Sequence, residues 1–439
     1  MKATIAKKGT KATMTIRDAH LFDPVQGLDT VTDVVLEKGM IARIGKSAGG
    51  GKDGRVLKAD GRLLLPGFVD PHVHLRAPGR EDEEDIASGT RAAASGGYVA
   101  VCAMPNTDPV ADNAAVLQSL IEQAEAEAVV RVAFMGAISH GLDGERLSDM
   151  WDLADAGAVA FTDDGSPVDS GGLLRAAFRA AELVGLPLSL HCEDRTLSDR
   201  GHMNEGGVSA ELGLAGIPCV AETAAVARDL DIAVFEGARV HVAHVSCAGS
   251  LGIIRAARDR GATITCEATP HHLLLSDEAV RGLDTGFKMN PPLRGEDDRR
   301  ALVAALAGGT IDCIGTDHAP HAGQEKEVPF EEAPFGVIGL ETAFAMLYTE
   351  LVEDGDVPLE TLVTAMSANP ARAFGLPLPA IAEGEEANLC LVDTEQEFNI
   401  EPDRFRSKSR NTPFAGRRVK GQVRLTIAAG RVAFREENV

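Results

Sequence analysis

The sequence predicts an α/β protein: a (β/α)8 TIM-like barrel with a small β-sandwich domain built from both chain ends. The long middle of the chain alternates short apolar runs with amphipathic segments about every 25 to 40 residues, which is typical of parallel β-α units. Both ends instead show short apolar alternations with turn signals and no helical period. Histidine and aspartate residues follow several apolar runs of the middle, as polar residues do at the top of such barrels.

The small β domain is expected to combine two distant segments. Residues 1–65 and residues 385–439 share the same β-rich texture, and residues 66–384 between them are expected to form the barrel. The chain has 439 residues. That length accommodates a barrel of roughly 250 to 400 residues together with a small additional domain.

Eight apolar runs are candidates for the barrel strands. They are residues 64–69, 99–104, 130–136, 158–161, 187–190, 240–245, 263–266 and 312–315. Helix candidates lie between them, for example at residues 113–126, 173–184, 221–230, 251–260, 299–306 and 341–351. Eight strands with intervening helices fit a closed barrel, and an open doubly wound sheet is the alternative with the same count.

Composition restricts the partners that this chain can have. Lys and Arg number 43 against 66 Asp and Glu, a net charge of −23 that would repel nucleic acid and anionic membranes. No segment approaches the ~20 apolar residues of a membrane span, and the first residues contain no apolar stretch of the length expected in a signal peptide. None of the seven cysteines forms a C-x-x-C pair, which indicates reduced thiols. We therefore expect a cytoplasmic protein without nucleic-acid or membrane partners.

The polar residues at the ends of the apolar runs predict a metal site. His72 and His74 are two residues apart, which places both imidazoles on one side of an extended segment. Taken alone, they could be two ordinary polar residues at a strand end. The residues that follow the other runs are Asp163, Asp164, His191, His244 and Asp317. Nitrogen and oxygen donors without a matching cysteine favour zinc or another borderline divalent ion.

Five sequence blocks resemble those of the dihydroorotases, a family of the amidohydrolase superfamily. The blocks are PGFVDPHVHLR at 66–76, MPNT at 104–107, FTDDG at 161–165, KMNPPLR at 288–294 and GTDHAPH at 315–321. The resemblance implies reversible hydrolysis of L-dihydroorotate to N-carbamoyl-L-aspartate in pyrimidine biosynthesis, by a metal-activated hydroxide. It also implies one or two zinc ions per chain and no organic cofactor.

The resemblance assigns roles to individual residues. Asp317 would be the catalytic proton shuttle. The metal ligands would be His72, His74, Asp164, His191, His244 and Asp317, and the substrate-binding residues would be Arg76, Asn106, Asn290 and His321. Many superfamily members use a carboxylated lysine as the bridging ligand, but this chain has no lysine between Lys58 and Lys288. The bridge is therefore expected at Asp164, whose spacing from His191 fits the family, and Asp163 is expected to be a turn residue.

Other readings of these residues stay open. Arg76 could clamp the carboxylate of the substrate, or it could only pair with the acidic stretch 81–85. Asn106 could be no more than a turn residue. Three further histidines are expected to be structural or to support the ligands: His271, His272 and His318. Residues 322–336 form a long loop without periodicity, and loops of that kind often cover active sites.

The alternative functions are another cyclic-amide hydrolase and a non-catalytic partner protein. Dihydropyrimidinases, hydantoinases and allantoinases are cyclic-amide hydrolases that share the fold and the paired histidines, but they usually carry the bridging lysine. A non-catalytic dihydroorotase-like partner of aspartate transcarbamoylase would be expected to lose metal ligands, and all six positions are filled here. The expected partner is a small-molecule substrate, and the resemblance allows a homo-oligomer or a complex with aspartate transcarbamoylase.

Overall fold

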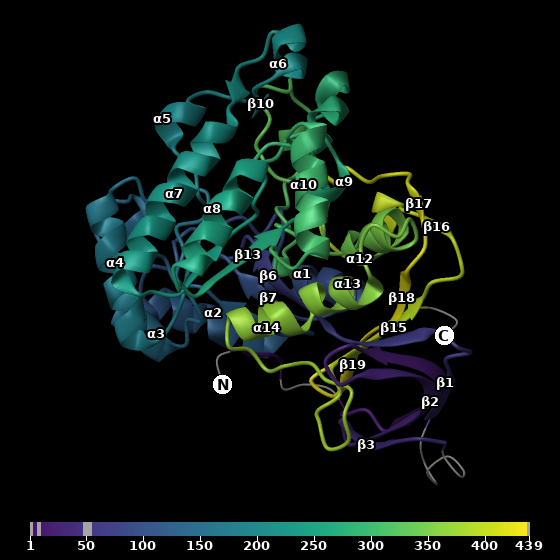
Figure 1. The fold of residues 1–439 in the computed structure, drawn as a ribbon. Coiled ribbons are helices and arrows are strands. Elements are labelled where there is room, and N and C mark those ends of the chain that lie inside the picture. Colours follow the sequence, from purple (N-terminus) through teal and green to yellow (C-terminus); the bar gives the residue numbers. More distant parts are fainter. Residues whose placement is uncertain (1–2, 7–9, 47–54, 437–439) are drawn as a thin grey trace.

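The computed structural model describes residues 3–6, 10–46 and 55–436. Its larger part is a set of parallel strands enclosed by helices, and its smaller part is a sheet that contains both the first and the last strands of the chain. Figure 1 shows the smaller part at lower right, below the helices. The expected combination of a barrel with a small β domain from both ends is confirmed.

Parallel strands form the barrel in two groups. The first group is β6 (Phe68–Val73), β7 (Tyr98–Ala103) and β8 (Arg131–Phe134), and the second is β9 (Leu188–Leu190), β12 (Val240–Val242), β13 (Ile264–Ala268) and β14 (Cys313–Ile314). Single parallel bridges join the groups. Phe161 pairs with Gly136 after β8 and with Leu188 in β9, and His318 after β14 pairs with Val73 in β6. The segment at Phe161 is thus the fourth of eight strand positions, and the ring closes.

The first barrel strand begins later than the sequence predicts. The apolar run 64–69 divides in the structure, because β5 (Leu63–Pro66) pairs antiparallel with β15 (Leu389–Asp393) in the small sheet. The barrel strand β6 starts only at Phe68. Gly67 lies at the junction, where a Cβ atom would stand 2.2 Å from the Cγ1 atom of Val99. One continuous apolar run therefore serves two cores.

The barrel strands are buried on both faces, which explains their uninterrupted apolar runs. In β7, Val101 and Ala103 belong to the cluster that includes the surrounding helices. The alternate residues Ala100 and Cys102 belong to a second cluster with Val69 of β6. Because successive side chains point to opposite faces, one set packs outward and the other fills the barrel.

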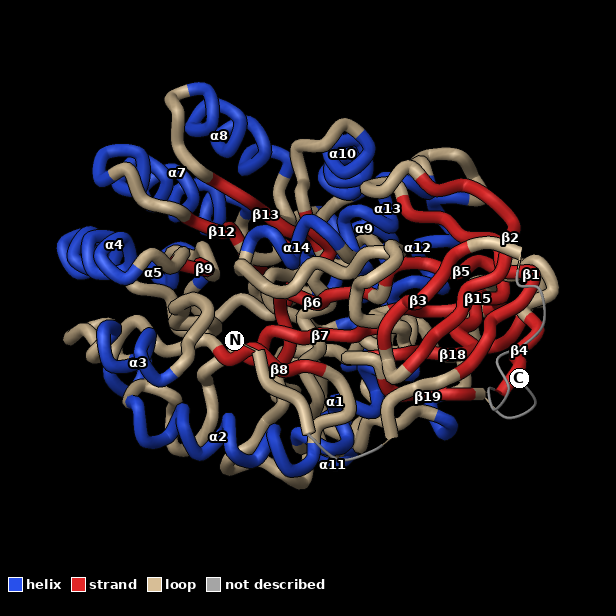
Figure 2. The backbone as a smooth tube through the Cα atoms, turned by 90° about the horizontal axis from the view of Figure 1, so that it is seen from below, coloured by secondary structure: helices blue, strands red, loops and turns tan. Residues whose placement is uncertain are grey.

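Helices cover the outside of the ring. They are α1 (Ile86–Ser95), α2 (Ala114–Glu127), α3 (Met150–Ala156), α4 (Gly171–Val184), α7 (Cys219–Glu236), α8 (Ala248–Asp259), α10 (Glu296–Ala307) and α13 (Leu359–Met366). The view from below shows α2, α3, α4, α7 and α8 outside the red barrel strands (Figure 2). Local signals begin and end them: the side chain of Asn113 accepts hydrogen bonds at the start of α2, and Gly185 ends α4 at φ +70°. The predicted helix 341–351 is α12 (Ala343–Leu347) followed by a π turn at Tyr348–Val352.

The two chain ends share one sheet. It contains β1 (Met14–Asp23), β2 (Leu28–Glu37), β3 (Met40–Ile44), β4 (Arg55–Lys58), β5, β15, β18 (Gln422–Ala428) and β19 (Arg431–Arg435), in the order β19-β18-β15-β5-β1-β2-β3 with β4 beside β1. The link between the ends is the β5–β15 pair, in which Leu64 lies opposite Leu391. Both leucines are buried in one core with Leu21 of β1 and Ile427 of β18. The division of the chain at residues 65 and 385 stays a prediction.

Short elements lie in the segments that follow the barrel strands β9, β13 and β14. They are α5 (Arg195–Ser198), β10 (Met203–Asn204), α6 (Gly207–Leu212), β11 (Gly216–Ile217), α9 (Pro270–Leu274) and α11 (Gly323–Lys326). Figure 1 shows α5, β10 and α6 at the top of the molecule. The segments that carry α5, α9 and α11 each follow a barrel strand, so this is the carboxyl end of the ring.

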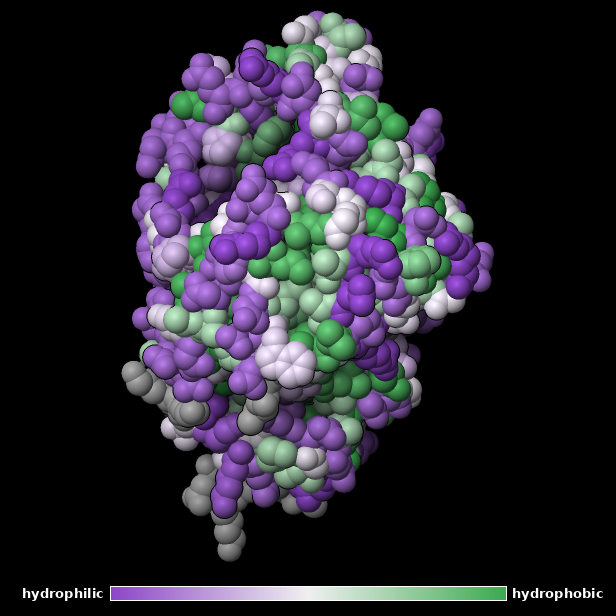
Figure 3. Space-filling view, turned by 90° about the vertical axis from the view of Figure 1, so that its left-hand side faces the viewer, coloured by the Kyte–Doolittle hydropathy of each residue, from purple (hydrophilic) through white to green (hydrophobic). Residues whose placement is uncertain are grey.

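The surface agrees with the charged composition. The face shown in Figure 3 is largely hydrophilic, with apolar areas between the polar side chains. The most exposed large apolar residues lie on helices: Trp151 in α3, Leu183 in α4 and Phe235 in α7. Among the described residues, no helix is both long and apolar enough to cross a membrane.

Candidate metal centre

Six side chains that the sequence predicts as ligands meet at the carboxyl end of the barrel. All six are buried. His72 lies near the end of β6, and His74 follows it. Each of the other four follows the end of a further strand: Asp164 after the strand at Phe161, His191 after β9, His244 after β12 and Asp317 after β14. Residues separated by up to 245 positions in the chain therefore surround one point, because parallel strands bring their carboxyl ends to the same edge.

Asp317 and Asp164 both contact the paired histidines. The Oδ1 atom of Asp317 lies 3.0 Å from Nε2 of His74 and 3.5 Å from Nε2 of His72. Asp164 approaches the same two nitrogens at 3.4 Å each. The donor atoms of His72, His74 and Asp317 all lie within 4.8 Å of one another, the spacing of a group that could hold a metal ion.

Asp164 also contacts the two histidines on the other side of the site. Its Oδ1 atom lies 3.6 Å from Nε2 of His244 and 3.7 Å from Nδ1 of His191. These two rings approach each other at 2.9 Å between the same two nitrogens. His72, Asp164 and His244 form a second group with donor atoms within 4.8 Å. Asp164 therefore stands between all four histidines.

Asp163 points away from this centre. Its Oδ1 atom accepts hydrogen bonds from the backbone N–H groups of Ile138 and Ser139 at 2.7 and 3.0 Å, and its Oδ2 atom accepts one from the Ser139 hydroxyl. Burial raises the pKa of Asp163 to about 6, although these hydrogen bonds oppose the shift. The structure thus separates two adjacent acids into one that faces the histidines and one that holds a loop.

Two atoms at the centre show that the site fits a cation. Nε2 of His72 and Oδ1 of Asp164 are buried and make no hydrogen bond within the described part of the chain. Leaving such groups unsatisfied costs about 1 to 3 kcal/mol each. The donors around them are imidazole nitrogens and carboxylate oxygens, the ligand set of zinc and similar divalent ions. A metal ion at this point would satisfy both atoms.

The electrostatics of the site agree with that fit. Burial would lower the pKa of His72, but the carboxylates of Asp164 and Glu267 outweigh it and raise this pKa well above its usual value. Burial likewise opposes ionisation of Asp164 and Asp317, yet the facing histidines hold both pKa values below the usual range. The acids therefore stay ionised in the interior and create a field that attracts positive charge.

Glu267 supports the site, and the sequence analysis did not single it out. Its carboxylate accepts hydrogen bonds from Nδ1 of His72 at 2.9 Å and from Nε2 of His241 at 3.0 Å. The fit is close, because a Cβ atom on Gly315 would stand 2.6 Å from Oε2 of Glu267. Glu267 lies in β13, one residue after the seventh predicted apolar run. It therefore follows an apolar run in the same way as the predicted ligands, and that signal could have identified it.

Backbone strain accompanies three of the predicted site residues. Arg76, His244 and Asp317 have φ values of 58°, 31° and 47°, in the left-handed region that non-glycine residues rarely adopt. Such conformations cost of order 1 to 3 kcal/mol each and persist where the surrounding structure enforces them.

The four predicted substrate-binding residues are distributed around the same mouth. Nδ1 of His74 lies 3.0 Å from Oδ1 of Asn106. Asn290 donates a hydrogen bond to Oε2 of Glu193 at 2.9 Å, and Nε2 of His191 lies 3.0 Å from the same oxygen. Glu193, two residues after His191, is a second supporting carboxylate that the sequence analysis did not select.

Arg76 and His321 both contact one buried acid, Glu83. Nε of Arg76 lies 3.1 Å from Oε2 of Glu83 and donates a hydrogen bond to the carbonyl of Pro320 at 3.0 Å. Nδ1 of His321 lies 3.2 Å from Oε1 of Glu83, and its Nε2 lies 2.8 Å from the carbonyl of Phe335. Arg76 therefore does pair with the acidic stretch 81–85, and its nearest contact there is made by Nε.

His271, His272 and His318, which the sequence analysis expects to be structural or to support the ligands, are all buried. His272 is fixed by Thr269 at 2.8 Å and by the carbonyl of Pro291 at 2.9 Å. His318 lies 3.3 Å from Oε2 of Glu84. Nε2 of His271 is buried without a hydrogen bond among the described residues, and burial together with the neighbouring His272 lowers its pKa well below the usual value.

The loop 322–336 is tied to the barrel by two lysines. The ammonium group of Lys288 donates to the carbonyls of Phe330 and Glu331, and it lies 4.8 Å from the ring centre of Phe335. Lys326, which lies within the loop, donates to the carbonyl of Thr285 outside it at 3.2 Å and to that of Pro334 inside it at 2.7 Å. The loop lies beside His321 through Phe335, and its mobility stays a prediction.

Comparison with known proteins places the chain in a family. It is 48% identical over 424 residues to the dihydroorotase of Pelotomaculum thermopropionicum, covering 96% of this chain and 98% of that protein. It is 47% identical over 423 residues to the dihydroorotase of Anaeromyxobacter dehalogenans strain 2CP-C, with the same coverage. The chain belongs to the dihydroorotase family. A family model described as Dihydro-orotase-like matches residues 61–250.

Solved structures agree with the architecture. The L-hydantoinase (dihydropyrimidinase) from Arthrobacter aurescens superposes with a TM-score of 0.88 at 26% identity, over 98% of this chain and 97% of that one. The D-hydantoinase (dihydropyrimidinase) from Thermus sp. gives a TM-score of 0.83 at 26% identity, over 96% and 95%. The chain is thus a metal-dependent cyclic-amide hydrolase, as the sequence predicts.

Proposed function

We propose that the chain catalyses the reversible hydrolysis of L-dihydroorotate to N-carbamoyl-L-aspartate. The observation that carries this proposal is the buried cluster at the barrel mouth, in which His72 and Asp164 hold donor atoms without hydrogen bonds. The guanidinium of Arg76 donates a hydrogen bond to the carbonyl of Pro320, three residues after Asp317. A metal site with an adjacent cation suits a cyclic amide that carries a carboxylate. The names of the similar proteins support the same substrate.

The proposed cofactor is zinc, with one or two ions per chain. Its ligands would be His72, His74, Asp164, His191, His244 and Asp317. When bound, such an ion lowers the pKa of water toward neutrality and polarises an amide carbonyl. The two donor groups share His72, and Asp164 contacts all four histidines, which supports Asp164 as the bridging carboxylate.

Asp317 is proposed to carry the proton. Its Oδ1 atom is held at 3.0 Å from Nε2 of His74, and its carboxylate is kept ionised by the facing histidines. An ionised carboxylate can accept the proton of the attacking water and deliver it to the ring nitrogen that leaves. In the reverse direction the same carboxyl group would take the proton from the amide nitrogen that closes the ring.

Arg76 is proposed to bind the ring carboxylate. Glu83 and Pro320 engage its Nε atom, and within the described residues no hydrogen bond engages Nη1 or Nη2. Those two groups form the fork that binds carboxylates in a bidentate manner. Asn106 and His321 are proposed to contact the same carboxylate, and His321 can do so through Nε2 only when the Phe335 carbonyl releases it.

Asn290 is proposed to recognise the ring amide. Its side-chain nitrogen donates to Glu193, which leaves the amide oxygen available to accept a hydrogen bond from a ring N–H. The same Glu193 oxygen contacts His191. One carboxylate therefore holds both Asn290, which is proposed to contact the ring amide, and His191, which is proposed to bind the metal.

The two alternative functions account for fewer of these site features than dihydroorotate hydrolysis does. A hydantoinase-type or allantoinase-type substrate would give the Arg76 fork no carboxylate to bind, and the lysine-free span 59–287 offers no carboxylated lysine. A non-catalytic partner of aspartate transcarbamoylase would not need six converging donors. A homo-oligomer, a complex with aspartate transcarbamoylase and a cytoplasmic location stay predictions; chromatography of the purified chain with and without that enzyme would test the assemblies.

The decisive experiment measures turnover on purified, zinc-loaded protein. Dihydroorotate and carbamoyl aspartate should interconvert, with ring opening favoured at alkaline pH because ring closure consumes a proton. Hydantoin, allantoin and 5,6-dihydrouracil should be poor substrates. Turnover of any of these three without turnover of dihydroorotate would contradict the proposal.

A further inference from the structure

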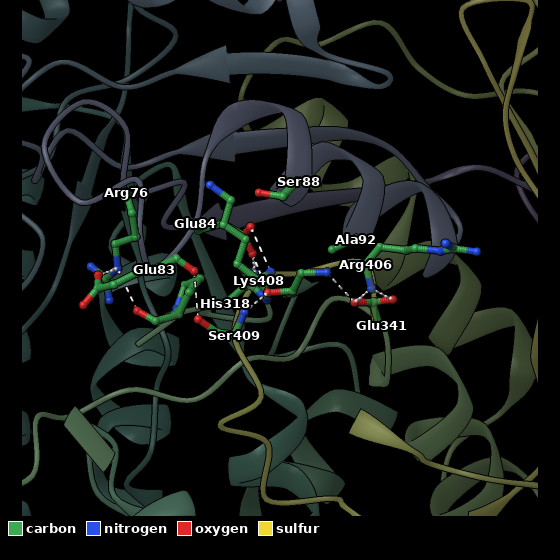
Figure 4. A network of polar contacts seen from close by, with 12 residues as sticks. Arg76, Glu83, Glu84, Ser88, Ala92, His318, Glu341, Arg406, Lys408 and Ser409 are labelled. Atoms are coloured by element: carbon green, nitrogen blue, oxygen red, sulfur yellow. Dashed lines mark hydrogen bonds and ion pairs between the residues drawn. The ribbon is translucent and has the colours of Figure 1, made fainter. Parts of the chain in front are cut away.

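One fully buried carboxylate, that of Glu83, contacts both Arg76 and His321. These two residues follow the first and the last barrel strand, and both are proposed to bind the substrate carboxylate. Its exposed fraction is 0%. Oε2 lies 3.1 Å from Nε of Arg76, and Oε1 lies 3.2 Å from Nδ1 of His321. A third contact comes from Arg80, whose side chain is 49% exposed and donates to Oε1 at 2.5 Å. Figure 4 shows the Arg76 side chain extending to Glu83 at one end of a longer polar network.

We propose that Glu83 is the positioning residue for carboxylate recognition. It holds the Nε edge of Arg76 and thereby presents the Nη1 and Nη2 fork to the substrate. It also holds the His321 ring in the same site. This inference rests on the proposed function, because it requires Arg76 to bind the substrate carboxylate.

A metal ion does not explain the acidic cluster. Glu83, His321 and Glu325 have donor atoms within 4.8 Å of one another, which taken alone is a spacing that a cation could use. However, Arg76 and Arg80 both place a guanidinium on the Glu83 carboxylate, and Arg80 also contacts Glu325. Two fixed positive charges at one carboxylate repel a further cation. The charge of Glu83 is therefore used to hold arginine.

The geometry at Arg76 indicates preorganisation. A free arginine side chain loses about 2 kcal/mol of rotamer entropy when it is fixed in one geometry. Here an ion pair with Glu83, whose Oε2 atom accepts no hydrogen bond within the described residues, and a hydrogen bond to the carbonyl of Pro320 fix the guanidinium through Nε before any substrate arrives. Binding is stronger when that cost is met in the free protein. The guanidinium must also be held rigidly, because a displacement of a substrate-positioning group by about 1 Å can lower the rate on the order of 100-fold.

The backbone that carries Glu83 is held by a distant segment. The hydroxyl of Ser409 lies 2.8 Å from the carbonyl oxygen of Glu83 and 2.8 Å from that of His321. The next residue, Glu84, accepts hydrogen bonds from the Ser407 hydroxyl at 2.5 Å and the Lys408 backbone at 3.3 Å. Residues 407–409 therefore join the loop before α1 to the loop after β14, and Figure 4 shows Ser409 and Lys408 within this network.

The test compares Glu83→Gln with Asp82→Asn. The Gln side chain keeps the volume and loses the charge, and Asp82 is an exposed acid of the same loop that supplies a matched loss of one charge. The probe is orotate, a planar ring with the same carboxylate, titrated into zinc-loaded protein by calorimetry. Glu83→Gln should weaken orotate binding about 10- to 100-fold and raise the KM for dihydroorotate more than it lowers kcat. Asp82→Asn should change neither, and zinc content should be equal in all proteins.

A double-mutant cycle with Arg76→Met separates positioning from a general structural role. Arg76→Met alone should weaken orotate binding at least about 100-fold, since a charge-assisted pair is lost. If Glu83 acts through Arg76, adding Glu83→Gln to Arg76→Met should cause little further loss. If Glu83→Gln does not fold, Glu83→Asp keeps the charge on a shorter side chain and should show an intermediate loss.

Each outcome decides between the readings. Strong non-additivity with unchanged zinc content supports the inference. Losses that multiply in the double variant, or normal orotate binding by Glu83→Gln when Arg76→Met binds weakly, overturn it and leave the proposed function intact. Normal orotate binding by Arg76→Met overturns both the inference and the proposed role of Arg76.

Discussion

Nδ1 of His72 lies 2.9 Å from Oε1 of Glu267 inside the barrel, where both side chains are buried. The hydrogen bond directs Nε2 of the same ring toward Asp164 and Asp317. Glu267 is also bonded to His241. Burial raises the pKa of Glu267, but the two histidines lower it more strongly, to about 2, so the carboxylate stays ionised and accepts both hydrogen bonds. A carboxylate in this position sets the tautomer and the orientation of the proposed ligand.

Glu267→Gln should therefore weaken zinc binding or activity by about 10- to 100-fold, since partners of this kind typically contribute that much. Competition with a chelator would measure the affinity. Glu222→Gln is the control, because Glu222 is also a buried carboxylate and its side chain bonds Ser246 and Ser250, which are not among the six proposed ligands. Equal losses of zinc affinity in both variants would show that the effect is not specific to His72.

The two adjacent aspartates should fail in different ways. Asp164→Ala removes the carboxylate between the four histidines and should lower activity by about 100-fold or more while the protein stays folded. Asp163→Ala leaves the N–H groups of Ile138 and Ser139 without their acceptor and should cost about 2 to 4 kcal/mol of folding stability. Activity per folded molecule and urea denaturation separate the two effects. The reverse ranking would place the bridge on Asp163.

Reconstitution should not require bicarbonate. A carboxylated lysine is made from carbon dioxide, whereas Asp164 already carries its carboxylate, and the span 59–287 contains no lysine. Metal-stripped protein should regain full activity when zinc alone is added in bicarbonate-free buffer. Metal analysis should then give between one and two ions per chain. Activity that returns only with added bicarbonate would refute the aspartate bridge.

Glu341 should make stability depend on pH. Burial, with Glu84 nearby, raises the pKa of Glu341 from 4.5 to about 7. Its carboxylate accepts hydrogen bonds from the backbone of Arg406 and Ser407, and it contacts Ser95 (Figure 4 shows the Arg406 end). The folded state then binds more protons than the unfolded state between these two pKa values. The free energy of unfolding should therefore fall by about 1 to 3 kcal/mol as pH rises from about 4.5 to about 7.

Glu341→Gln should remove that slope. The amide oxygen can accept from Arg406 and Ser407, and the amide nitrogen can donate to Ser95, whose own hydrogen can go to the carbonyl of Ala92. Denaturation midpoints at several pH values would measure the difference between the two proteins. A wild-type slope that persists in Glu341→Gln would assign the dependence to another group.

The sequence by itself predicted the barrel strands and the histidines at their ends, whereas the bridges that close the ring are seen only in the structure. Each barrel strand is an apolar run because both faces are buried, as Val101 and Cys102 show on opposite faces of β7. Since parallel strands align their carboxyl ends, the residues that follow the runs lie at one end of the barrel, and all of the predicted ligands face the centre, although Asp163 points away from it. His191 and His244 come together for this reason, although 53 positions separate them.

Only the tertiary structure decided how that centre is supported. Nothing in the acidic stretch 81–85 distinguishes Glu83, which holds Arg76, from the exposed Asp82 beside it. Ser409 lies 326 positions after Glu83 in a segment without a recognisable pattern, yet its hydroxyl reaches the Glu83 carbonyl. Gly67 likewise divides an unbroken apolar run between two cores. Periodicity encodes which face of a local segment is buried, whereas the partner of a buried polar group depends on which distant loops the whole fold brings within about 3 Å.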